Sequence, residues 1–105
     1  MLNTIKNMLG LGPKVNLAEV IKQGAVIVDV RTKGEYASGH IKGSLNIPVD
    51  QLGRNLSKFS DKNKPIITCC ASGMRSAAAK NILKSNGYLE VYNGGSWQGL
   101  QKKLR

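Results

Sequence analysis

One cysteine in this sequence lies in a setting that suits nucleophilic chemistry. Cys70 and Arg75 are separated by four residues, and the segment joins an apolar run to a helical pattern. Gly73 can adopt a positive φ, and in such a tight turn successive backbone N–H groups converge and bind an anion. A sulfur atom at that point is favoured as a nucleophilic thiolate. The loop around it is expected to consist of Ala71, Ser72, Gly73, Met74 and Arg75.

The side chains of this loop suggest further interactions with a sulfur-containing anion. Arg75 supplies a fixed positive charge for a sulfur-oxyanion substrate. Ser72 either donates a hydrogen bond to bound sulfur or caps the turn. A persulfide or thiosulfonate adduct on Cys70 is anionic and would be held by the same backbone donors. We therefore predict covalent catalysis at Cys70, with Ser76 among the supporting residues.

The elements on either side of the loop must position it. The apolar run Ile66-Ile67-Thr68-Cys69, opened by Pro65, predicts a buried strand that leads directly into the loop. Apolar residues at helical spacing predict a helix over residues 75–86, with Gly87 just after its end. The first turn of this helix would add unpaired N–H groups and the positive end of its dipole.

The remaining sequence alternates strand and helix patterns. Helices are predicted up to Gly24, over residues 32–38 with a Thr32–Glu35 capping box, from Asp50 through Phe59, and around Trp97. Strands are predicted over residues 25–30, 44–47 and 88–92. Such alternation predicts an α/β fold with a central, mainly parallel sheet of four to five strands and helices on both faces. Ligands of such sheets bind beyond the carboxyl ends of strands, which is where the Cys70 loop falls.

Length and composition limit the functions to consider. The 105 residues fit one domain, with residues 1–14 as an N-terminal extension and 15–104 as the core. The sequence has 16 Lys and Arg against 6 Asp and Glu, a formal charge of +10, spread along the chain without nucleic-acid-binding motifs. No apolar run is long enough to span a membrane, and we expect a monomeric, cytoplasmic protein without specific nucleic-acid or membrane binding.

The two cysteines are adjacent, so they cannot cross-link distant parts of the fold. Together with the single histidine, His40, they make a poor metal site, and no metal is expected. Cys69 continues the apolar strand and is expected to be a core residue. His40 invites comparison with a Cys–His dyad, but a structural hydrogen bond in its Gly-His-Ile turn is the preferred interpretation. Trp97 is expected to pack the last helix.

Several motifs together resemble the successive signatures of rhodanese-like domains, from about residue 17 to residue 100. The resemblance implies that Cys70 accepts sulfur, that residues 71–75 surround it, and that Asp29, Arg31 and His40 hold the fold around the site. It implies transfer of sulfane sulfur from a small anionic donor such as thiosulfate to cyanide or a thiol, in ping-pong fashion and without a cofactor. The matching segments are Val28-Asp29-Val30-Arg31, Glu35-Tyr36, Gly39 to Ser44, Asn46-Ile47-Pro48, the Cys70 loop and Gly94-Gly95-Ser96-Trp97.

Two alternative functions stay open at this point. One is a persulfide carrier that delivers sulfur to a protein partner. The other is a cysteine-dependent phosphatase or arsenate reductase, which resembles this loop but has five residues between Cys and Arg. Counting from Cys69 would satisfy that spacing, yet Gly73 would then fall one position too late. Neutral Ala71 and Ser72 also differ from the best-known thiosulfate-using loops, so the donor stays open.

Overall fold

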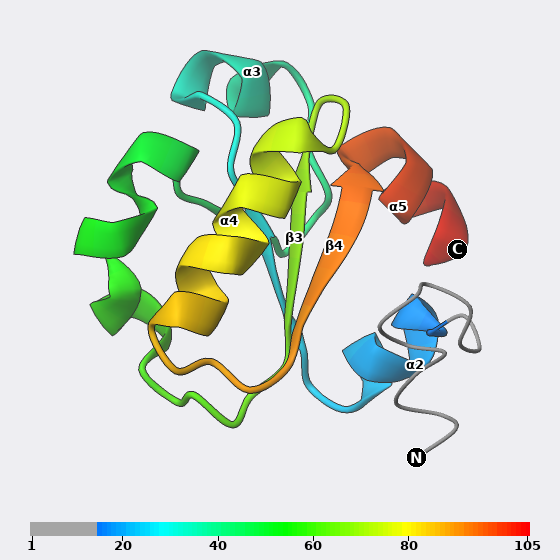
Figure 1. Ribbon diagram of the computed structural model, residues 1–105. Coiled ribbons are helices and arrows are strands. Elements are labelled where there is room, and N and C mark those ends of the chain that lie inside the picture. The colour runs from blue at the N-terminus through cyan, green and yellow to red at the C-terminus, as the bar shows by residue number, and fades with distance from the viewer. Residues whose placement is uncertain (1–14) are drawn as a thin grey trace.

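The computed structural model describes residues 15–105, which form an α/β fold around a four-stranded, fully parallel sheet. The strands are β1 (Val26–Asp29), β2 (Leu45–Asn46), β3 (Ile66–Cys70) and β4 (Val91–Ser96), in the spatial order β2-β1-β3-β4. Figure 1 shows β3 and β4 side by side. The predicted fold class is therefore confirmed. The predicted N-terminal extension, residues 1–14, lies outside the described residues.

Side chains of β3 alternate between two apolar layers, which places the neighbouring cysteines on opposite faces of the sheet. Cys70 packs in the layer covered by α4 (Met74–Ser85) and by two 3₁₀ helices, η1 (Val49–Arg54) and η2 (Leu56–Phe59). Cys69 packs in the layer covered by α2 (Leu17–Lys22) and α5 (Trp97–Lys103). Helices thus cover both faces, as Figure 1 shows for α4 on one side and α2 and α5 on the other.

The short helix α3 (Lys33–Ser38) lies at the same end of the sheet as the loop between β3 and α4 (Figure 1). It follows β1 directly, and its first turn carries the predicted capping box: the Thr32 hydroxyl accepts from the Glu35 backbone, and the Glu35 carboxylate accepts from the Thr32 backbone. The longest helix of residues 15–105 is α4, with 12 residues. None of the helices in this part of the chain is long and apolar enough to cross a bilayer.

The segment after Pro48 differs from the prediction of one helix capped by Asp50. It forms η1 and η2, and the residue at the N-cap position of η1 is Pro48, with no side-chain cap. Asn55 separates the two 3₁₀ helices with φ −124° and ψ 24°, outside helical values. Gly53 and Asn55 are poor helix formers, which is consistent with two short turns in place of a continuous helix.

The last strand also differs from the prediction, because it begins three residues later and includes Asn93, Gly94 and Gly95, whose residue types favour a turn. Tyr88 is instead a buried side chain whose hydroxyl donates to the Phe59 carbonyl at 2.8 Å. The strand continues through Gly94, where a Cβ atom would lie only 2.8 Å from the Thr68 carbonyl oxygen. Glycine thus permits β4 to approach β3 closely beside the Cys70 loop.

Candidate active site

The Cys70 sulfur lies at the end of β3, beneath a three-residue turn that leads into α4. Its Sγ accepts backbone N–H groups from Gly73 at 2.9 Å and from Ser76 at 3.3 Å. Gly73 has φ 105°, a left-handed value that disfavours any residue with a Cβ. The turn and the first residues of α4 thus direct backbone donors at one sulfur atom, the arrangement expected from the sequence. Such donors stabilise a thiolate or a persulfide anion.

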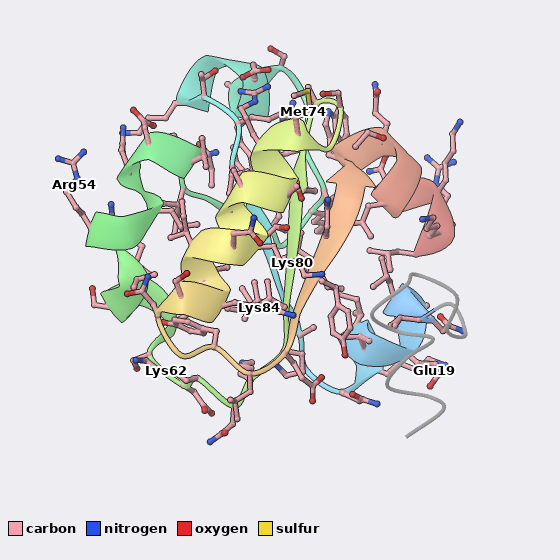
Figure 2. The ribbon with its side chains drawn as sticks, viewed as in Figure 1. Glu19, Arg54, Lys62, Met74, Lys80 and Lys84 are labelled. Carbon is pink, nitrogen blue, oxygen red and sulfur yellow. The ribbon has the colours of Figure 1, made fainter. Side chains whose placement is uncertain are left out.

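The sulfur is screened from solvent although the loop itself is not. Cys70 has 0% exposure, whereas Ala71, Ser72 and Met74 are exposed. Met74 is 82% exposed and lies at the end of the molecule where α3 is found (Figure 2). The structure therefore places the predicted loop residues around the sulfur, with three of their side chains on its outer surface.

A hydrogen-bond network that is buried at Thr68 and Ser76 and exposed at Asn93 holds the inner side of this loop. The Ser76 hydroxyl lies 2.7 Å from Thr68 Oγ1 and donates to Asn93 Oδ1 at 2.6 Å. Asn93 in turn accepts from the Gly95 backbone at 2.9 Å and donates to the Gly73 carbonyl at 3.4 Å. The network joins β3, β4 and α4 directly behind the sulfur. Ser76 was expected from the sequence, but Thr68 and Asn93 were not, since neither lies in the loop.

Arg75 does not project freely into the site, because Glu35 of α3 binds its guanidinium. Nη1 and Nη2 donate to the two carboxylate oxygens at 2.7 and 3.0 Å. This contact, together with the Thr32 donors, lowers the pKa of Glu35 to about 2. The sequence identified Glu35 as a capping residue of α3. Its pairing with Arg75 depends on the packing of two elements 40 residues apart, which no local pattern reveals.

Asp29 and Arg31 form a buried ion pair at the end of β1. Arg31 Nη2 lies 2.6 Å from Asp29 Oδ2 and also donates to the Gly39 carbonyl at 2.7 Å. The Trp97 ring lies 4.9 Å from the guanidinium carbon. The hydrogen bonds that Arg31 donates to the Asp29 carboxylate raise the pKa of Arg31 above its usual value. The Asp29 carboxylate and the Arg31 guanidinium thus hold the chain in place around the loop.

His40 also takes part in local structure. Its Nδ1 lies 2.8 Å from the Tyr36 carbonyl oxygen, and its ring stacks on the Tyr36 ring with centroids 3.7 Å apart. The Tyr36 hydroxyl donates to the Ser44 carbonyl at 2.6 Å. These contacts fix the turn that follows α3. In the described part of the chain, no hydrogen bond joins His40 to Cys70, so the structure offers no Cys–His dyad there.

Cys69 is separated from the site by the sheet. Burial is the main reason that its pKa is raised to about 12, with the Asp29 carboxylate adding to the effect. Its exposure is 0%, and its neighbours are core residues of the layer formed with α2 and α5. A thiol in this setting stays protonated and unreactive. Among residues 15–105, no three His, Cys, Asp or Glu side chains cluster as metal ligands.

Comparisons with known proteins bear on the family of the chain. The family model described as the rhodanese-like domain matches residues 14–103. The chain is 39% identical over 75 residues to the thiosulfate sulfurtransferase GlpE of Pseudomonas fluorescens, covering 69% of this chain and 65% of the relative. It is 35% identical over 69 residues to the thiosulfate sulfurtransferase PspE of Escherichia coli, covering 65% of this chain and 66% of the relative. The matches thus span slightly less than two thirds of the length of these two curated relatives.

A solved structure of a rhodanese-like domain protein from Staphylococcus aureus has a TM-score of 0.66 and 35% identity, covering 91% of this chain and 83% of that chain.

Proposed function

Because the chain belongs to the family of rhodanese-like domains, we propose that it is a sulfurtransferase that carries sulfane sulfur as a persulfide on Cys70. The observation that carries this proposal is the pair of backbone N–H groups directed at Cys70 Sγ, from Gly73 and Ser76. Two such donors stabilise negative charge on sulfur in both the free thiolate and the loaded persulfide. The same two backbone donors, which we call the sulfur cradle, therefore stabilise both forms of the enzyme.

The proposed reaction has two halves. In the first, the Cys70 thiolate attacks the outer sulfur of a donor such as thiosulfate, a new S–S bond forms, and sulfite leaves with the electron pair of the broken bond. In the second, an acceptor such as cyanide or a thiolate attacks the outer sulfur of the Cys70 persulfide and restores the thiolate. Each half conserves charge and needs no cofactor, and the covalent intermediate predicts ping-pong kinetics.

The burial of Cys70 bears on how the donor arrives. Since the sulfur has no exposed surface, we infer that the exposed turn of residues 71–73 must move outward before a donor sulfur can reach it. Glycine at position 73 favours such a movement, because it has the widest choice of backbone conformations. The network of Thr68, Ser76 and Asn93 remains fixed beneath the turn and can restore the cradle once the sulfur is bound.

Intact-mass measurement tests the proposal directly. Reduced protein is incubated with thiosulfate, and in parallel with glutathione persulfide, and then treated with cyanide. Wild type and Cys69→Ser are expected to gain one sulfur atom and to lose it with cyanide, whereas Cys70→Ser gains none. Steady-state rates with thiosulfate and cyanide should give parallel lines in double-reciprocal plots. Absence of any adduct on wild type with both donors would refute the sulfurtransferase assignment.

A further inference from the structure

The structure shows that the cation of the catalytic loop is already engaged by a carboxylate. Arg75 is the only Lys or Arg between Cys70 and Ser76. Both of its terminal nitrogens bind Glu35, whose Oε1 also accepts from the Thr32 backbone at 3.0 Å and from the Thr32 hydroxyl at 3.0 Å. The carboxylate is therefore held from two sides, and its position does not depend on Arg75 alone. The two side chains are 36% and 37% exposed, so the pair faces solvent at the edge of the loop.

We propose that Glu35 determines which charge of sulfur donor the site prefers. By pairing with Arg75 it cancels the charge of the loop cation, and singly charged or neutral sulfane donors are therefore favoured over doubly charged thiosulfate. This inference rests on the proposed function and narrows its substrate class. A cation and an anion within about 3 Å act at longer range as a dipole, whose field decays faster than that of a free guanidinium. An incoming dianion therefore gains less attraction than an unpaired Arg75 would give it.

Two donors of matched chemistry separate charge from reactivity. Thiosulfate delivers its outer sulfur to the Cys70 thiolate and releases sulfite, as described above. Methanethiosulfonate delivers an equivalent sulfur by the same attack and releases methanesulfinate with the electron pair of the broken S–S bond. The second donor has a methyl group in place of one charged oxygen, so it carries one negative charge where thiosulfate carries two. The ratio of the two loading rates thus measures how the site treats the extra charge.

The test uses Glu35→Gln, because glutamine keeps the size of the side chain and is accepted at the third position of a capping box. Removing this one charge is expected to raise the thiosulfate-to-methanethiosulfonate ratio by roughly three- to tenfold, the effect of one partly screened charge near the site. The matched control is Glu19→Gln, which changes the net charge equally but lies in α2, far from the loop end marked by Met74 (Figure 2). Its ratio should equal that of wild type.

The opposite substitution distinguishes a charge effect from a structural one. Arg75→Gln leaves Glu35 unpaired and should lower the ratio, whereas Glu35→Gln/Arg75→Gln should return it to within about twofold of wild type. Near 1 M salt, where the Debye length is about 3 Å, the differences should largely disappear. If both single variants lower loading with both donors equally, the pair is merely structural and the inference is overturned. If wild type loads with none of the three donors, thiosulfate, methanethiosulfonate and glutathione persulfide, the proposed function is overturned instead.

Discussion

The hydroxyl groups of Thr68 and Ser76 lie 2.7 Å apart beneath the turn that carries Cys70. Thr68 belongs to β3 and Ser76 to α4, so this contact joins the strand before the catalytic loop to the helix after it. Both side chains have 0% exposure. The position of the Ser76 N–H relative to Cys70 Sγ therefore depends on a hydrogen bond that water does not compete for.

Ser76→Ala should weaken the fold measurably. The substitution keeps the backbone N–H that contacts Cys70, but it removes the hydroxyl partner of Thr68 and Asn93. Thr68 keeps the carbonyl groups of Ser76 and Tyr92 as acceptors, so we expect the free energy of unfolding in urea to fall by about 0.5–1.5 kcal/mol, the net contribution of a typical hydrogen bond. Ser38→Ala is the control, because the Ser38 hydroxyl bonds only an exposed carbonyl of its own helix. Equal effects of the two substitutions would contradict a special role for the network.

Gly94→Ala should be far more damaging than Gly34→Ala. A Cβ at residue 94 would lie 2.8 Å from the Thr68 carbonyl and 2.9 Å from side-chain carbons of Ile67 and Leu100. Because backbone must shift to make room, we expect a loss of about 1–3 kcal/mol or more. At residue 34, in α3, no atom beyond the adjacent residues and the backbone of the helix itself lies within 4 Å of the added Cβ, and alanine should stabilise by about 0.5–1 kcal/mol. Thermal unfolding of both variants measures the contrast.

The features that could be predicted from sequence are those encoded within a few residues. The alternation of β3 places Cys69 and Cys70 on opposite faces, the Thr32–Glu35 capping box begins α3, and Gly73 allows the turn above the sulfur. Each depends on local backbone geometry, so its residues are visible as a short pattern.

The features that escaped prediction depend on contacts between distant segments. The glycines at 94 and 95 follow the usual signal for a turn, yet Gly94 serves the close approach of β4 to β3. Likewise, the capping box already explains a glutamate at position 35, and no sequence pattern indicates that it pairs with Arg75. At Gly94, tertiary packing overrides the local preference for a turn. At Glu35, the local sequence carries no information about the contact with Arg75.

Cys69 should remain unmodified under conditions that label Cys70. Its pKa of about 12 leaves almost no thiolate at pH 8.5, and its side chain is buried on the far face of the sheet. Cys70 is equally buried, but it lies under the turn that we propose to move outward, so we expect native Cys69→Ser to take up one iodoacetamide group and native Cys70→Ser to take up none over the same period. In concentrated urea both variants should be labelled, which controls for the reagent. Rapid labelling of native Cys70→Ser would contradict the assigned burial.

The Glu35–Arg75 pair should contribute to stability only above the acid range. In the folded chain the pKa of Glu35 is about 2, below its ordinary value of 4.5, mainly because of the Arg75 contact. A lowered folded-state pKa means that the unfolded chain binds the proton more tightly, so the contribution is complete above about pH 4.5 and is lost as pH falls towards 2. The stability of wild type relative to Glu35→Gln should therefore decline across this window, as measured by urea unfolding at several pH values. The control compares Arg75→Gln with Glu35→Gln/Arg75→Gln, since both variants lack the guanidinium that lowers the pKa of Glu35. The stability difference between these two variants should depend on pH much more weakly. An equally steep decline of that difference would show that Arg75 does not hold the carboxylate ionised.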